Sequence, residues 1–174
     1  ERGLLKVHFS GGEVLCHPEI FPILGDARDL GLQVNLTSNG TLITKETARQ
    51  LVETGVHSIS ISLDSCYPET HDRLRGTKGA FKKTVKALQY LVKYGEKQKK
   101  KKIKIRVNTV VCRDNVDHME GIHQLLSDIH PGIFWKLLPV DAFHNKKLRL
   151  DREKTGELME KISQWPLLQD IPLE

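Results

Sequence analysis

The sequence lacks long apolar runs, is poor in aromatic residues and has few cysteines. No stretch approaches the roughly 20 apolar residues that a transmembrane helix needs, which argues against a membrane protein. The three cysteines, Cys16, Cys66 and Cys112, are far apart and odd in number. They predict no disulfide framework, and a reducing cytoplasm is the simplest expectation for the location of the protein.

Aromatic residues make up only 6% of the 174 residues, and none is interleaved with the lysine-rich segment at 97–104. Surfaces that bind single-stranded nucleic acid combine positive charge with aromatic side chains on which bases stack, so a nucleic-acid partner is not expected. A run of like charge between two regular elements is usually a solvated, self-repelling loop. We therefore expect a loop at 97–104, and much of the net charge of +5 lies there.

The remaining composition, 39% hydrophobic and 28% charged, is that of an ordinary globular domain. A length of 174 residues suits one domain with a substantial core. The first residues, Glu1-Arg2-Gly3, form neither an initiator methionine nor a signal peptide, so we treat the chain as a fragment.

Apolar, β-rich segments alternate with segments of helical periodicity along the chain. The expected strands cover residues 4–9, which we expect to be buried, 33–37, 58–63, 103–111 and 133–138. The expected helices cover residues 18–30, 45–53, 81–94, 118–129 and 152–165. Thr44, Asp117 and Asp151 are suited to N-cap three of these helices, and Gly55 to end the second. Five such units predict an α/β fold with a parallel sheet, either doubly wound or a whole or partial barrel.

A glycine pair stands where the first expected strand meets the first helix, in Ser10-Gly11-Gly12-Glu13. Without Cβ atoms this backbone can approach a ligand closely, and the Glu13 carboxylate is a natural partner for a ligand ammonium group. The alternatives are a turn that only needs flexible residues and an anion-binding turn in an α/β nucleotide or phosphate enzyme.

Several segments together resemble the core domain of the radical S-adenosylmethionine (radical SAM) family. They are HFSGGEVL at 8–15, VNLTSNGTLI at 34–43, ISISLD at 59–64, PETHDRLRG at 68–76, NTVV at 108–111 and WKLLP at 135–139. The nearest subgroup is the one that modifies peptides or proteins, or assembles peptide-derived cofactors. The resemblance implies a TIM-like partial (βα)6 barrel in which residues 1–174 supply strands two to six. The family's Cys-x-x-x-Cys-x-x-Cys cluster loop does not occur in the sequence, so we expect the first βα unit and any C-terminal extension to lie outside it.

The resemblance also implies an oxidoreductase that uses S-adenosylmethionine and a [4Fe-4S] cluster whose ligands are not in this chain. Such an enzyme cleaves S-adenosylmethionine reductively to a 5′-deoxyadenosyl radical, which abstracts hydrogen from a substrate, here a peptide or protein. Its partners would include an electron donor such as flavodoxin or ferredoxin, and the 174-residue chain alone should be inactive. The alternatives are a barrel without a cluster that serves as a binding or scaffold domain, and the nucleotide or phosphate enzyme mentioned above.

The family motifs assign cofactor-binding roles to ten positions, with no catalytic or metal-binding side chain among them. They are Gly11, Gly12, Glu13, Ser38, Asn39, Ser62, Asp64, Arg75, Asn108 and Leu138. Gly11, Gly12 and Glu13 would bind the methionine ammonium group of S-adenosylmethionine, and Arg75 its carboxylate.

Ser62 would reach the ribose or the carboxylate, Asp64 and Asn108 would lie near the ribose, and Leu138 near the adenine. The competing structural roles are a small barrel filler for Ser62, a cap on the following loop for Asp64 and a structural hydrogen bond for Asn108. Core packing is the alternative for Leu138, and an ion pair with Asp72 is the alternative for Arg75. His71 and Trp135 are expected to face solvent and the core, respectively.

Overall fold

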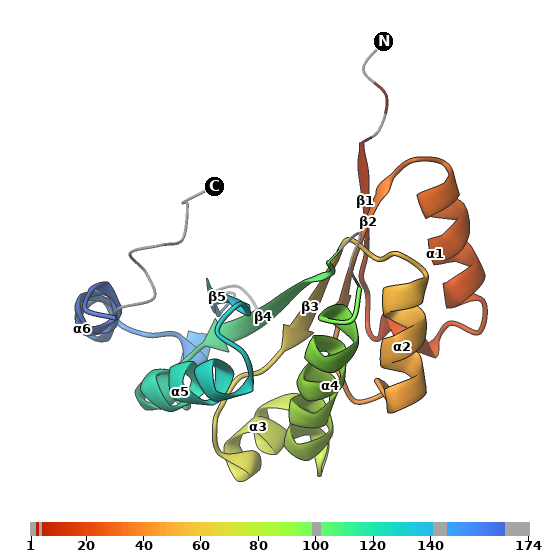
Figure 1. The fold of residues 1–174 in the computed structure, drawn as a ribbon. Helices are drawn as coiled ribbons and strands as arrows, with labels where there is room; N and C mark the ends of the chain where they lie inside the picture. Colours follow the sequence, from red (N-terminus) through yellow and green to blue (C-terminus); the bar gives the residue numbers. More distant parts are fainter. Residues whose placement is uncertain (1–2, 4, 99–101, 141–145, 166–174) are drawn as a thin grey trace.

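The computed structural model describes residues 3, 5–98, 102–140 and 146–165. Its centre is a five-stranded parallel sheet in the order β1-β2-β3-β4-β5 (Figure 1). The strands are β1 (Lys6–Phe9), β2 (Gln33–Ser38), β3 (Ser58–Ser62), β4 (Lys104–Val111) and β5 (Phe134–Pro139). Because each strand pairs with the next one in the sequence, the order never reverses as it does in a doubly wound sheet. The sheet is therefore a wall of a partial barrel, as the family resemblance implies, and it is not closed within the described residues.

Helices follow the strands and cover one side of the curved sheet (Figure 1). They are α1 (Ile20–Asp29), α2 (Lys45–Glu53), α3 (Pro68–Arg75), α4 (Ala80–Gly95), α5 (Met119–Ile129) and α6 (Arg152–Ser163). Short 3₁₀ turns lie at η1 (Val14–Cys16), η2 (Val116–His118) and η3 (Lys146–Leu148). None of the helices in the part of the chain that the model covers is long and apolar enough to cross a membrane.

The core lies between the sheet and these helices. Ile59 and Ile61 of β3 and Val107 of β4 are fully buried there, together with Leu24 of α1 and Leu88 of α4. Side chains alternate between the two faces of a strand. The intervening residues therefore point to the other face of the sheet. No layer of helices from the described residues covers this face, which we call the open face.

Local sequence signals account for several of the helix ends. The Thr44 hydroxyl accepts a hydrogen bond from the Thr47 amide at 3.2 Å, and the Asp151 carboxylate accepts one from the Lys154 amide at 2.9 Å. Gly55 follows α2 with φ of +82°, a left-handed conformation that favours glycine. Three of these predicted caps are thus confirmed. The fourth is wrong, because α5 begins at Met119 after the turn η2 and has no side-chain cap.

The first strand is shorter and less buried than predicted. Lys6 and His8 are exposed, Val7 and Phe9 are half-buried, and Leu5 precedes the strand with 79% of its surface exposed. In the described structure β1 pairs on one side only, with β2, so it cannot be enclosed as an inner strand is. The burial predicted for this segment is therefore wrong.

Helix α3 lies between the strand expected at 58–63 and the helix expected at 81–94, where no helix was predicted. Pro68 opens it at the first turn and Gly76 ends it in a left-handed conformation with φ of +63°, both standard signals for helix ends. Its sequence is mostly polar, so the apolar periodicity that reveals a helix is weak. The lysine-rich segment includes residues 99–101, which lie outside the described residues, while Lys102 and Lys104 on its far side are exposed.

Candidate functional site

The carboxyl ends of the five parallel strands meet at one edge of the sheet, where this class of fold binds its ligands. Glu13 lies at this edge and connects the ends of β1 and β2. Its Oε1 accepts hydrogen bonds from the Ser38 hydroxyl at 2.8 Å and the Leu15 amide at 3.2 Å. Its Oε2 accepts one from the Asn39 amide at 2.7 Å. The Glu13 side chain is thus fixed by groups from two strand ends rather than free in solvent.

These contacts leave Glu13 able to accept one more donor. An ionised carboxylate offers about four lone-pair sites, and three of those on Glu13 are used within the chain. The remaining site belongs to Oε2, and Glu13 is only partly buried. A pre-oriented carboxylate with one unused acceptor site suits an ammonium group, which is the role predicted for Glu13.

The glycine pair beside Glu13 leaves space for a ligand. A Cβ atom added to Gly11 or Gly12 would meet no other atom within 4 Å, and both residues are exposed. Gly11 also has φ of +150°, in the range where other residues are strained. This backbone is therefore accessible at the strand ends, as a close approach to a ligand requires.

Ser38 and Asn39 act within the chain to build this turn. The Ser38 hydroxyl also accepts a hydrogen bond from the Gly40 amide at 3.0 Å, and Ser38 is only 2% exposed. The Asn39 side-chain oxygen accepts from both the amide and the hydroxyl of Thr41, at 2.8 and 2.7 Å. The geometry therefore gives Ser38 and Asn39 a positioning role beside Glu13, and a direct contact of either with a cofactor stays a prediction.

Asp64 connects the end of β3 to β4 and α3. Its Oδ1 accepts a hydrogen bond from the Val110 amide at 2.9 Å, and its Oδ2 pairs with Nη2 of Arg75 at 2.7 Å. Burial raises the pKa of Asp64, and the charge of Arg75 and the Val110 hydrogen bond oppose that rise. Asp64 does not cap the following loop, because Ser65 accepts the hydrogen bond from the Tyr67 amide there.

Arg75 presents a guanidinium group that is only partly satisfied. Its partner is Asp64, so the alternative of an ion pair with Asp72 is wrong. Asp72 instead accepts hydrogen bonds from the amides of Gly79 and Phe81 at the start of α4. The Nε of Arg75 is buried and has no hydrogen-bond partner among the described residues. The Arg75 side chain as a whole is 26% exposed, so a ligand carboxylate can approach the guanidinium group, although not its buried Nε.

His71 lies behind this ion pair, although the sequence predicted contact with solvent. It is fully buried, and its Nδ1 accepts a hydrogen bond from the Asp64 amide at 3.1 Å. Burial, followed by the charge of Arg75, lowers the pKa of His71 to about 4. A neutral ring with the proton on Nε2 follows from these contacts, so His71 supports Asp64 and does not face a ligand.

Asn115 completes the support of Asp64, and the sequence analysis did not identify it. Its Nδ2 donates to the carbonyls of Asp64 and Val110 at 2.7 and 2.9 Å, and its Oδ1 accepts from the Cys112 amide at 2.7 Å. It is 1% exposed. The signal that could have found it is an amide side chain just after the end of a strand, where it can bind free backbone groups.

The other three predicted side chains lie on the open face. Ser62, Asn108 and Leu138 are each half-buried, and Ser62 is in register with Asn108. No side-chain hydrogen bond holds Asn108 to another described residue, so the structural alternative for it gains no support. Leu138 pairs in register with Val110, and the two form an apolar strip near the strand ends.

The cysteines do not gather into a metal site. Cys16 is exposed, Cys66 half-buried and Cys112 buried, and within the described ranges no three His, Cys, Asp or Glu side chains could together hold a metal ion. Burial raises the pKa of the thiols of Cys66 and Cys112, which disfavours the thiolate form that binds metal. These side chains do not fit an iron–sulfur cluster.

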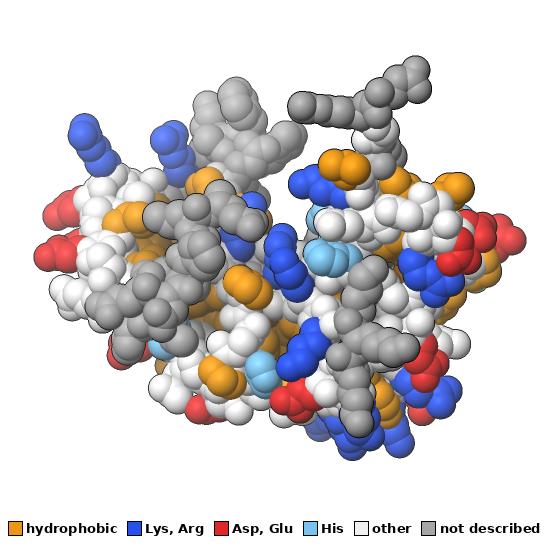
Figure 2. All heavy atoms as spheres, turned by 45° about the horizontal axis from the view of Figure 1, so that its top comes forward, with side chains coloured by type: hydrophobic (Ala, Val, Ile, Leu, Met, Phe, Trp, Pro, Cys, Tyr) orange, Lys and Arg blue, Asp and Glu red, His pale blue; other side chains and the backbone are white. Residues whose placement is uncertain are grey.

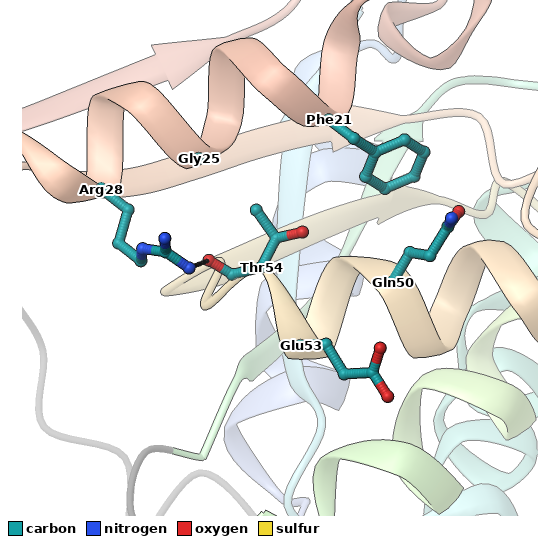
Figure 3. Close-up of a pocket in the computed structure, with 6 residues that line it drawn as sticks. All are labelled: Phe21, Gly25, Arg28, Gln50, Glu53 and Thr54. Atoms are coloured by element: carbon teal, nitrogen blue, oxygen red, sulfur yellow. Dashed lines mark hydrogen bonds between the residues drawn. The ribbon is translucent and has the colours of Figure 1, made fainter.

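A separate groove lies between α1 and α2, on the helical side of the sheet (Figure 3). Phe21, Arg28 and Gln50 line it, and the Arg28 guanidinium donates to the Thr54 carbonyl at 2.9 Å and to Asp29. The bond to Thr54 ties α1 to the end of α2. The groove is therefore a junction between two helices, away from the strand ends that hold Glu13 and Asp64.

Comparison with known proteins identifies the family. The model of the radical SAM superfamily matches residues 1–126, and the chain belongs to this superfamily. It is 34% identical over 157 residues to an AdoMet-dependent heme synthase of Oleidesulfovibrio alaskensis, covering 90% of the chain and 38% of that protein. It is 28% identical over 129 residues to a PqqA peptide cyclase of Bradyrhizobium diazoefficiens, covering 74% of the chain and 32% of that protein.

A solved structure shows the same fold. SuiB of Streptococcus suis, bound to its precursor peptide SuiA, superposes with a TM-score of 0.74 at 18% sequence identity. The match covers 97% of this chain and 37% of SuiB. The chain thus spans about a third of the length of these proteins. The family and fold expected from the motifs are confirmed. The alternatives, a barrel without a cluster that serves as a scaffold and an α/β nucleotide or phosphate enzyme, are not favoured.

Proposed function

We propose that this chain supplies the S-adenosylmethionine-binding wall of a radical SAM enzyme. The observation that carries the proposal is the Glu13 carboxylate, which three hydrogen bonds from the end of β2 and from the turn η1 hold beside the open backbone of Gly11 and Gly12. Glu13 and the glycine backbone bind the methionine ammonium group. The Arg75 guanidinium, whose side chain is 26% exposed, pairs with the methionine carboxylate.

Three of the remaining predicted residues bind the nucleoside part. Ser62 and Asn108, in register on neighbouring strands, lie along the ribose. Leu138 lies against the adenine, together with Val110, because both present apolar surface on the open face. When bound, the cluster and S-adenosylmethionine together supply an electron and a 5′-deoxyadenosyl group that abstracts hydrogen from a substrate. The chain's own residues orient the methionine and ribose ends of that cofactor.

The substrate and partners belong to the same proposal. A peptide or protein substrate is supported by the similarity to a PqqA peptide cyclase and by the fold shared with SuiB, which was solved with a peptide. A heme-related substrate is supported by the higher identity to AdoMet-dependent heme synthases. We further propose a flavodoxin or ferredoxin as electron donor, a [4Fe-4S] cluster held by residues outside this chain, and a cytoplasmic location, in keeping with three free cysteines.

The test is release of 5′-deoxyadenosine from S-adenosylmethionine by the protein of the complete open reading frame. The protein is reconstituted with iron and sulfide and reduced with dithionite, and the product is measured by chromatography. We expect release by the unchanged protein and by Glu157→Gln, which alters an exposed carboxylate on α6. Glu13→Gln should reduce release at least tenfold at limiting S-adenosylmethionine. No release by the unchanged protein, or equal release by Glu13→Gln, would contradict the proposal.

A further inference from the structure

Positive charge gathers on the open face of the sheet. The four exposed cations are Lys6 of β1, Lys104 and Arg106 of β4 and Lys136 of β5, and they alternate with side chains that are buried on β4 and half-buried on β1 and β5. Figure 2 looks toward this side of the molecule, where blue Lys and Arg side chains and a pale blue His side chain line a hollow in the middle of the view. None of these four cations forms an ion pair with another described residue.

Two of these cations lie next to the proposed cofactor site. Lys136 is in register with Asn108, the residue placed along the ribose. Arg106 precedes Asn108 by two residues on the same strand, so it points to the same face about 7 Å further from the strand end. Because the register pairs Arg106 with Phe134, Arg106 and Lys136 are diagonal neighbours with Cα atoms about 8 Å apart.

The surroundings of this pair carry no described acid that would neutralise it. Ser60 lies beside Arg106 on β3, and Ser62 lies beside Asn108. Phe134 is 45% exposed next to Arg106. The nearby carboxylates of Glu13 and Asp64 are engaged with the partners described above. Two neighbouring cations without a counter-ion, flanked by hydroxyl groups and an aromatic ring, are suited to a substrate that brings its own negative charge.

We propose that Arg106 and Lys136 bind a carboxylate of the substrate and thereby place the adjacent carbon beside the ribose of S-adenosylmethionine. This inference rests on the proposed function, since the ribose position is taken from it. Arg106 can hold a carboxylate with two parallel hydrogen bonds, whereas Lys136 adds a point charge. The carboxylate belongs either to a tetrapyrrole or to an acidic side chain of a peptide, two sources of one chemistry.

The experiment measures binding to the reconstituted full-length protein by calorimetry. The probes are iron coproporphyrin III, with its tetramethyl ester as the uncharged control, and an acetylated tetraglutamate peptide, with tetraglutamine as its control. The variants are Arg106→Gln, Arg106→Lys and Lys136→Gln, with Lys86→Gln as a matched change of charge on the exposed side of α4. S-adenosylmethionine binding is measured for every variant in parallel.

We expect one acidic probe to bind and its uncharged control not to bind. Arg106→Gln and Lys136→Gln should each lower the affinity for that probe about tenfold. Arg106→Lys should lower it less, and Lys86→Gln should leave it unchanged. Binding of the porphyrin identifies a tetrapyrrole source, and binding of tetraglutamate identifies a peptide source. S-adenosylmethionine affinity should be unchanged in all four variants.

The inference is overturned if neither acidic probe binds, or if the Arg106 and Lys136 variants bind the acidic probe as tightly as the unchanged protein does. It is also overturned if these variants lose affinity for S-adenosylmethionine as well. In the last case the two cations serve the cofactor and not the substrate. Failure of the unchanged protein to bind S-adenosylmethionine would instead overturn the proposed function. The two failures are therefore distinguishable.

Discussion

Protonation of His71 should make the stability of the protein depend on pH between about 4 and 6.5. The ring is fully buried and its pKa is lowered to about 4 from an ordinary value of 6.5. Between these values the unfolded chain binds a proton that the folded chain does not, so stability falls as pH falls. This difference in pKa corresponds to about 3 kcal/mol of unfolding free energy, which is present in full above pH 6.5 and lost below pH 4.

The assay compares urea unfolding of the unchanged protein and of His71→Phe from pH 7.5 to pH 4.5. His71→Phe leaves the Asp64 amide without its acceptor and should be less stable at pH 7.5. The difference in unfolding free energy between the variant and the unchanged protein should shrink by about 2 kcal/mol at pH 5, because the variant has no imidazole to protonate. In His17→Phe, an exchange at an exposed histidine, the unfolding free energy should change with pH as it does in the unchanged protein. If His71→Phe shows that same pH dependence, the His71 ring of the unchanged protein is not held neutral and the reasoning fails.

Three further changes test the structure around the site. Thr44→Ala removes the cap of α2 and should cost about 1 kcal/mol of unfolding free energy, measured by urea titration. Gly40→Ala should lower the free energy of unfolding more than Gly79→Ala does. Both glycines have φ near +80°, but only at Gly40 would a Cβ lie 3.3 Å from the α4 backbone. Equal losses would mean that this close approach is absent. Asp64→Asn should lower the free energy of unfolding by about 2 kcal/mol. The double variant with Arg75→Met should lose less than the sum of the two single losses, whereas strict additivity would show that the two side chains do not interact.

The sequence allowed the arrangement of strands and helices to be predicted because local patterns determine it. Ile59 and Ile61 alternate with serines, which defines the two faces of β3 without any knowledge of its neighbours. The bounds predicted for α2 agree with the structure, since Thr44 caps its start and Gly55 follows its end. The burial of the first strand was not predictable from its composition, which does not reveal that β1 pairs on one side only among the described residues.

The interior of the candidate site was less predictable, because its contacts join residues far apart in the sequence. His71 stands in a polar segment, and its burial follows only from the way α3 packs behind Asp64. Arg75 has an acid nearby in the sequence, Asp72, but the helix places that acid at the start of α4 and Arg75 against Asp64. The motif positions Gly11 to Glu13 were easier to identify because the motif itself forms the turn.

The central claim is that Glu13 and Arg75 bind opposite ends of the amino acid part of S-adenosylmethionine. The most direct measurement is calorimetric titration of S-adenosylmethionine into the reconstituted full-length protein, into Glu13→Gln and into Arg75→Lys, with iron analysis of each. Both contacts are charge-assisted, at about 1.5–3 kcal/mol each. We therefore predict affinity lower by about ten- to a hundredfold in each variant, with iron content unchanged. Unchanged affinity in both variants would contradict the account.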